Sequence, residues 1–155
     1  MKRLQILVLS AFLPFMAAAQ TKAPLIVPEP AAGPLVVMDA QGVTMAEFLW
    51  LKRLIVVFAN SPNDPNVTTQ LEFLAERPDQ LAERDVVVIV DTNPAEMSLF
   101  RQRLRPRGFS LVLLDKDGNV EIRKPRPWDV REITRAIDKF PLARQEMLER
   151  FPAGR

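Results

Sequence analysis

Polar residues that follow predicted strands are the ones that could bind a ligand or do chemistry. Asparagine and serine offer neutral hydrogen-bonding groups, and aspartate adds a carboxylate that can act as a general acid or base, or hold a hard cation such as Ca²⁺. We expect these residues to gather at one edge of a sheet, because ligands bind beyond the carboxyl ends of parallel strands. The candidate ligand-binding residues are Asn60, Ser61, Asn63, Asp64, Asn66, Asp91 and Ser110.

Helix capping is the simpler interpretation of part of this set. Asp64 and Asn93 each precede a proline, and a capping side chain followed by proline is a typical helix start. Asp64 and Asp91 could form a pair of carboxylates, which is the minimum set of groups for general acid–base catalysis. A carboxylate-dependent hydrolase or metal-assisted enzyme is therefore an alternative, while the main hypothesis has no catalytic residue, no metal and no cofactor.

A second candidate site is a run of arginines at alternate positions, Arg101, Arg103, Arg105 and Arg107, with no acidic residue among them. Guanidinium groups bind phosphates and carboxylates. The run could therefore bind an anionic glycan, a lipid headgroup or an acidic partner. A structural role stays open, because alternate spacing scatters side chains around a helix and cations near a helix C-terminus are favourable without any ligand.

The residue types that the chain lacks exclude whole classes of chemistry. Its 155 residues include no histidine and no cysteine. The protein therefore has no imidazole base, no thiolate nucleophile, no Ser/His/Asp or Cys/His triad and no disulfide. Thiol–disulfide oxidoreductase and cysteine peroxidase activities are excluded on this ground, and we expect the protein not to be an enzyme.

The N-terminus has the pattern of a cleavable signal peptide. Lys2 and Arg3 precede an apolar run, Leu4 to Phe15, and Ala17–Ala19 supplies the small residues of a cleavage site. The run is shorter than the roughly 18 residues that span a bilayer. We predict a signal peptide over residues 1–19, cleavage near Ala19, a periplasmic or secreted protein, and no stable membrane insertion after cleavage.

The charge of the chain without this segment argues against a nucleic-acid partner. Of the 21 basic residues, two lie in residues 1–19, and the remaining 19 balance the 19 acidic residues. Nucleic-acid binding depends on an excess of basic residues that neutralise phosphates. We therefore expect a protein or small-molecule partner in the cell envelope, of unknown identity.

Hydrophobic patterns predict the elements that must position these residues. The Pro- and Ala-rich segment 20–34 indicates a linker, 35–150 a single domain and 151–155 a disordered tail. Apolar runs predict doubly buried strands over 54–59 and 86–90, and the pattern predicts a third strand over 110–114. Residues 35–38 could form a short edge strand. A tight turn at 116–119 leads to an antiparallel strand over 120–123.

Helical patterns fill the remaining segments. They predict a short helix opened by a Thr44–Glu47 capping box, and helices over 65–81 with a bend near Pro78, from Asn93 to Leu104, over 127–137 and over 141–150. Trp50 and Trp128 are expected in the core or at its edge. The order βαβα, then a hairpin, then α predicts an α/β fold: a mixed four-stranded sheet with helices on both faces.

This order is that of thioredoxin, and the residues add to the likeness. The stretch 56–66 is similar to the thioredoxin strand and active-site loop, with Asn63 and Asn66 at the positions of the two cysteines. Ser110 stands at the position of the cis-proline. Both hallmarks are replaced, so the resemblance does not carry the disulfide-exchange function to this chain.

The chain resembles still more closely the bacterial domain-of-unknown-function family numbered 4174, a cysteine-poor group similar to peroxiredoxins and thioredoxins. The segments 54–65, 112–120 and 137–147 carry this resemblance, which covers roughly residues 36–150. It implies an exported thioredoxin-like domain without an assigned activity. We expect a redox-inactive, non-catalytic binding module of the bacterial cell envelope.

Overall fold

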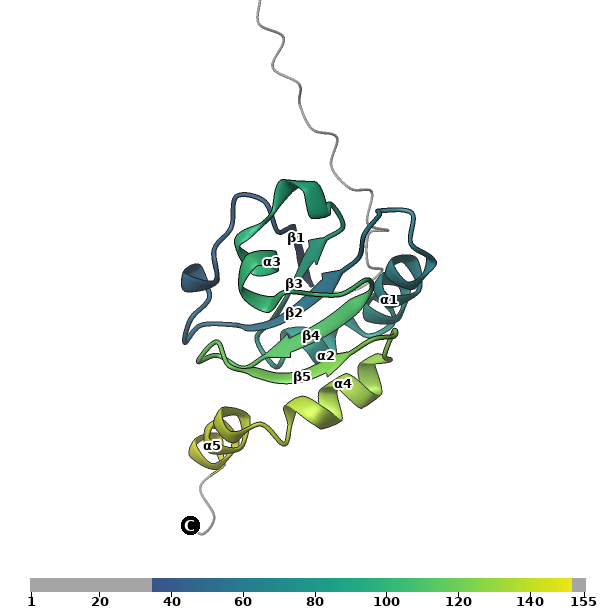
Figure 1. Cartoon of the computed structure of the whole chain (residues 1–155). Coiled ribbons are helices and arrows are strands. Elements are labelled where there is room, and N and C mark those ends of the chain that lie inside the picture. The colour runs from purple at the N-terminus through teal and green to yellow at the C-terminus, as the bar shows by residue number, and fades with distance from the viewer. Residues whose placement is uncertain (1–34, 152–155) are drawn as a thin grey trace, which may run out of the picture.

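The computed structural model describes residues 35–151, which form a mixed five-stranded sheet with helices on both faces (Figure 1). The predicted signal peptide, the linker over 20–34 and residues 152–155 of the predicted tail lie outside the described residues. The elements are β1 (Val36–Asp39), η1 (Met45–Glu47), β2 (Arg53–Phe58), α1 (Pro65–Glu76), α2 (Pro78–Ala82), β3 (Val86–Asp91), η2 (Pro94–Glu96), α3 (Leu99–Leu104), β4 (Ser110–Leu114), β5 (Val120–Lys124), α4 (Val130–Ile137) and α5 (Pro141–Arg150).

The sheet has the strand order β1-β3-β2-β4-β5. β2 and β3 are parallel, β4 runs antiparallel to β2, and β5 runs antiparallel to β4. Every residue of β2, β3 and β4 is buried, which confirms the two predicted doubly buried strands and shows that the third predicted strand is buried as well. The mixed sheet is confirmed, but the predicted four strands are one too few. β1 pairs with β3 in parallel and is only partly buried, so it lacks the long apolar run that identified the other strands.

The two faces of the sheet carry separate cores. α1, α2 and α4 cover one face, where Val67, Leu74, Leu81 and Ile133 pack against inward residues of β2, β3 and β4. η1 and α3 cover the other face through residues such as Phe100. The predicted arrangement, with helices on both sides of a central sheet, is therefore confirmed.

Of the two helix starts predicted from capping residues, the one at Asp64 is confirmed and the one at Asn93 differs. Asp64 caps α1 as predicted, and the chain breaks at Arg77, so that the predicted bent helix is two helices. The predicted helix start at Asn93 was wrong in extent, because only a 3-10 turn follows before Met97 adopts a left-handed conformation with φ of 45°. α3 begins two residues after Met97, at Leu99, and the Ser98 side chain caps it by accepting a hydrogen bond from the backbone N–H of Arg101.

The two tryptophans have different environments. Trp128 is partly buried against the α4 side of the core, with Lys124 Nζ 4.6 Å from the centre of its ring. Trp50 is 67% exposed, so its predicted place in or beside the core was wrong. The predicted capping box before η1 is present, with the backbone N–H of Thr44 donating to Glu47 Oε1 at 2.7 Å.

Candidate functional site

The predicted ligand-binding loop lies at the end of the central strand. β2 ends at Phe58, and the loop that follows exposes Asn60, Ser61 and Asn63 before α1 begins. The Ser61 hydroxyl accepts a hydrogen bond from the backbone N–H of Asn63 at 3.2 Å. Asn63 therefore lies in the loop at the tip of β2, as the comparison with thioredoxin predicted.

Asp64 orders the end of this loop. Its Oδ1 accepts hydrogen bonds of 2.9 Å from both the backbone N–H and the side-chain amide of Asn66. The carboxylate thus caps α1 while it holds Asn66 in the first helical turn. A cap of this kind contributes about 1 kcal/mol to stability, so the position of Asp64 has a structural explanation.

Asp91 is a buried partner of Arg101. The residue ends β3 at 3% exposure, and Arg101 donates to its Oδ1 from Nη2 at 2.7 Å and from Nε at 3.1 Å. The Ser98 hydroxyl donates to Asp91 Oδ2. Both carboxylate oxygens are thereby occupied, which removes Asp91 from the predicted acid–base pair with Asp64.

Arg101 also ties together the ends of two strands. Its Nη2 donates to the carbonyl oxygens of Ala59, at 2.9 Å, and of Asp91, at 3.0 Å, and its guanidinium lies 5.5 Å from the Phe58 ring centre. We call Ser98, Asp91, Arg101 and the Ala59 carbonyl the strand-end brace. This brace fixes the point at which the Asn60–Asn66 loop leaves the sheet.

Ser110 reaches the same edge from a third strand. It is the first residue of β4, and it stands opposite Phe58 in the antiparallel pairing. Gly108 in the preceding turn has a φ of 60°, which glycine adopts without strain. The prediction that this turn approaches the edge is confirmed, but Ser110 is only 5% exposed and lies beneath the surface.

The arginine run does not form one surface. Arg101 is buried in the strand-end brace, so its predicted role in an anion site was wrong. Arg103, Arg105 and Arg107 are exposed, and Arg103 Nη2 donates to the Gly118 carbonyl at 3.3 Å. Alternate spacing separates these side chains because Arg101 lies on the buried side of α3 with Phe100 and Leu104.

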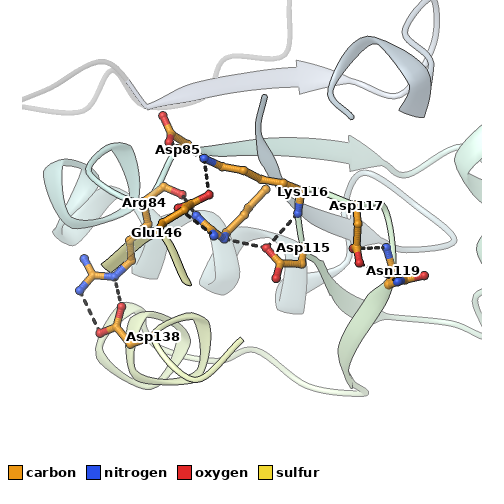
Figure 2. A network of polar contacts seen from close by, with 9 residues as sticks. Arg84, Asp85, Asp115, Lys116, Asp117, Asn119, Asp138 and Glu146 are labelled. Carbon is orange, nitrogen blue, oxygen red and sulfur yellow. Dashed lines mark hydrogen bonds and ion pairs between the residues drawn. The ribbon is translucent and has the colours of Figure 1, made fainter. Parts of the chain in front are cut away.

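A second cluster of charged residues lies at the opposite end of the central strand (Figure 2). Arg53, the first residue of β2, is 3% exposed and donates from Nε to Asp115 Oδ1 at 2.9 Å. Its Nη1 donates to the Arg84 carbonyl at 3.0 Å and its Nη2 to Glu146 Oε2 of α5 at 3.1 Å. Lys116 Nζ lies 2.8 Å from Glu146 Oε1. We call this set the base network.

The base network perturbs the titration of its members. Burial alone would raise the pKa of Glu146, but Lys116 and Arg53 outweigh that effect and lower the pKa below its ordinary 4.5. The pKa of Asp85 is lowered in the same way, because hydrogen bonds from Lys116 and Lys52 outweigh its burial. Burial would lower the pKa of Lys116, but Asp85 and Glu146 raise it above 10.5. All these groups are therefore charged across the neutral range.

A cavity of about 440 Å³ opens beside this network, under α5. Arg53, Arg84 and Arg150 contribute positive charge to its lining, and Glu83, Asp138 and Glu146 balance it. Arg84 is itself held by Asp138, with Nε–Oδ1 and Nη2–Oδ2 distances of 2.8 and 3.0 Å. The charged lining of the cavity is therefore balanced, with three arginines and three carboxylates.

Sequence reasoning missed the base network. Arg53, Lys116 and Glu146 carry no motif, and the Arg53–Glu146 pair joins residues 93 positions apart. The one available signal was Arg53 standing directly before a strand buried on both faces, a place where a charged side chain requires a partner.

The described part of the chain has no site of the usual metal type. Among residues 35–151, no three His, Cys, Asp or Glu side chains come together in a way that could hold a metal ion. Within the same residues, no helix combines the length and apolarity that crossing a bilayer requires.

The order of the sheet and the packing of helices on both of its faces define a thioredoxin-like fold. The structure is similar to that of the reduced 2-Cys peroxiredoxin of Plasmodium vivax, with a TM-score of 0.53, 16% identity and coverage of 69% of this chain and 85% of that one. It is also similar to chloroplastic thioredoxin z, with a TM-score of 0.52, 19% identity and coverage of 70% and 96%. The chain belongs to the DUF4174 family, a domain of unknown function, whose model matches residues 44–146.

Proposed function

We propose that this protein is an exported, non-catalytic binding module of the cell envelope, and that its partner contacts the Asn60–Asn66 loop. The observation that carries the proposal is the combination of exposed amides with a rigid support. Asn60, Asn63 and Asn66 are exposed, and the buried strand-end brace holds the loop at Ala59. A loop ordered before binding loses little conformational entropy when a partner arrives.

The chemistry of the loop favours binding over catalysis. Neutral amides donate and accept hydrogen bonds but are poor nucleophiles and poor acid–base groups. The sequence has no cysteine, so the thiol chemistry associated with this position in thioredoxins is excluded. The alternative carboxylate-dependent enzyme loses support because Asp91 is buried and doubly occupied by Ser98 and Arg101.

The location rests on the N-terminal residues. Lys2 and Arg3, the apolar run that follows, and the alanines at 17–19 support export with cleavage of the leader. Mass spectrometry of the protein recovered from the periplasm or the medium tests this part directly. We expect a mature N-terminus at Gln20, and a protein retained with Met1 in the cytoplasm would contradict the location.

Site-specific photocrosslinking tests the binding loop. A photoreactive residue at Asn63 is expected to capture a defined partner in intact cells, whereas the same residue at Gln145, exposed on α5, is not. Binding of the purified partner should then weaken in Asn63→Ala and Asn66→Ala, with Gln145→Ala as the matched control. Equal adducts at both positions, or affinities insensitive to the loop variants, would refute the assignment.

A further inference from the structure

Two large apolar side chains stand exposed side by side between η1 and β2. Trp50 is 67% exposed and Leu51 is 64% exposed, although the core lies only a few residues away at Phe48 and Leu54. An exposed aliphatic residue alone needs no explanation, because much of any protein surface is apolar. An exposed tryptophan is a more specific feature, since tryptophan is enriched at membrane–water interfaces and at the centres of protein interfaces.

The backbone at Trp50 argues that the fold does not require this side chain. Trp50 has a φ of 65°, a conformation that glycine adopts freely and that is strained for a bulky residue. The backbone N–H of Trp50 donates to the Lys116 carbonyl at 2.7 Å, a hydrogen bond that any residue except proline could make. Glycine would serve the turn better, so the tryptophan needs another reason.

An exposed arginine also contacts the turn between β4 and β5, to which the backbone of Trp50 is bonded. Arg103 Nη2 donates to the Gly118 carbonyl, and a Cβ added to Gly118 would lie 2.8 Å from Leu49 Cδ2 and 3.9 Å from Arg103 Nη2. Leu49, the residue before Trp50, and Arg103 therefore both lie against the Lys116–Asn119 turn. We call Trp50, Leu51, Arg103, Arg105, Arg107 and Arg123 the Trp–Arg surface.

The remaining arginines extend this surface along the end of α3. Arg123 Nη2 donates to the Leu104 carbonyl at 2.9 Å, which brings the β5 side chain next to Arg105. Arg105 and Arg107 are exposed. Arg103 and Arg123 donate to backbone carbonyls, whereas Arg53, Arg84 and Arg101 form ion pairs with carboxylates.

The net charge of the Trp–Arg surface determines which kind of anionic partner it could bind. The hairpin of β4 and β5 carries three carboxylates; Asp115 is buried and bonded to Arg53, which leaves Asp117 and Glu121 to oppose the four arginines. The Asp117 side chain is turned to Asn119, accepting from its backbone N–H at 2.9 Å and from its side-chain amide at 2.7 Å. The surface is positive on balance but not strongly so, and an anionic partner that also accepts apolar side chains suits it better than a purely polar polyanion.

We propose that the Trp–Arg surface docks the protein on a bilayer that contains anionic lipid. Trp50 and Leu51 would enter the headgroup boundary, where tryptophan is favoured, while Arg103, Arg105 and Arg107 contact lipid phosphates. The charge complementarity comes from the arginines and the apolar contact from the two exposed side chains. This attachment is peripheral and lies on a different part of the chain from the Asn60–Asn66 loop.

Vesicle co-sedimentation of the full-length chain and its variants tests the proposal. We expect binding to vesicles that mix phosphatidylglycerol with phosphatidylcholine, little binding to phosphatidylcholine alone, and release by salt. Arg105→Gln with Arg107→Gln should weaken binding about thirtyfold, since each basic residue near an anionic surface contributes a factor of about five. Arg135→Gln with Lys139→Gln is the matched control, because it removes the same charge from an exposed position of α4 and from an exposed position just after that helix.

Trp50→Gly separates a binding role from a structural one. The variant should fold with equal or higher thermal stability, because glycine relieves the left-handed strain and a largely exposed side chain is lost, yet bind the mixed vesicles about tenfold more weakly. In a Trp128→Phe background the emission of Trp50, the remaining tryptophan of the chain, should shift to shorter wavelength on vesicle binding.

Three results would overturn the proposal. The first is equal binding to mixed and neutral vesicles, and the second is equal loss in the arginine variant and its control. The third is capture of a soluble polyanion such as dextran sulfate without vesicle binding, which would assign the arginines to a glycan. All variants share residues 1–34, so any contribution of that segment cancels in the comparison. Failure here leaves the loop proposal intact, because crosslinking at Asn63 does not depend on vesicles.

Discussion

Replacing Arg101 with methionine should destabilise the domain by about 3–5 kcal/mol, the typical effect of leaving one partner of a buried ion pair alone. Asp91 is 3% exposed, and the guanidinium of Arg101 makes both of the bonds to its Oδ1. The same substitution removes the donors to the carbonyls of Ala59 and Asp91. Only the Ser98 hydroxyl would then remain as a partner for the carboxylate.

The loss should be easy to measure. For a domain of this size, 1 kcal/mol corresponds to about 4 °C in Tm, so Arg101→Met should melt about 12–20 °C lower than the unmodified protein. Thermal and urea denaturation followed by circular dichroism give the change in the free energy of unfolding. Arg103→Met is the matched control, because Arg103 is exposed and surface substitutions change that free energy by about 0.5 kcal/mol or less.

A double variant separates the cost of leaving Asp91 unpaired from the net contribution of the Asp91–Arg101 ion pair to stability. Asp91→Leu with Arg101→Met replaces both charges by apolar groups, and such replacements of buried pairs are often close to neutral. We therefore expect the double variant to be more stable than Arg101→Met by at least about 1 kcal/mol. A loss below about 1 kcal/mol in the single variant, or a double variant as unstable as the sum of the two single ones, would refute this account of the brace.

Three further predictions concern the base network and the loop. Glu146→Gln should lower the free energy of unfolding by about 1 kcal/mol and loosen α5, measured as faster amide hydrogen exchange over 141–150, with Glu149→Gln as the control. The lowered pKa of Glu146 stabilises the native state above its ordinary 4.5, and this contribution is lost as the pH falls through the lowered value. The raised pKa of Lys116 acts in the opposite sense, with its contribution lost as the pH rises above 10.5, so the protection of α5 amides relative to their intrinsic exchange rate should fall at both extremes. Asn63→Cys with Asn66→Cys should form a reversible disulfide, detected by thiol titration.

Each of these has a clear contrary outcome. Unchanged exchange over α5 in Glu146→Gln would mean that apolar contacts such as that of Ala143 hold the helix without the ion pairs. Protection of the α5 amides, relative to their intrinsic exchange rate, that stays constant between pH 3 and pH 8 would contradict the linkage to carboxylate titration. A pair of introduced cysteines that stays reduced in air, while the protein remains folded, would place Asn63 and Asn66 too far apart for the thioredoxin comparison.

The sheet could be predicted from the sequence because its signals are local. The runs at 54–59, 86–90 and 111–114 are entirely apolar, as expected for strands that are buried on both faces. The Asp64–Pro65 start depends on neighbours within one helical turn, and it was confirmed. The turn at 116–119 fixed β5 as antiparallel for the same reason.

The burial of charged residues could not be predicted, because it depends on distant partners. Arg101 belongs to a run of arginines that looks uniform, yet it alone points inward, to an aspartate ten residues earlier. Arg53 meets Asp115 across 62 positions and Glu146 across 93. The departure at Trp50 has a different cause, since its exposure follows from a positive φ that is unusual for tryptophan and that no local pattern indicates.

The two buried arginines together explain how a domain without disulfides fixes its central strand. Arg53 begins β2 and donates hydrogen bonds to Asp115, which follows β4, and to Glu146 of α5. Arg101 donates to the carbonyl of Ala59, just after β2 ends. The loop at 60–66 therefore leaves a strand that is held at both ends by side chains far from it in sequence. Because asparagine cannot change its covalent state with the redox potential, the geometry of this loop depends on these ion pairs and not on oxidation. A partner that binds the loop would therefore contact the same surface in oxidising and in reducing conditions. This constancy suits binding better than a catalytic redox cycle.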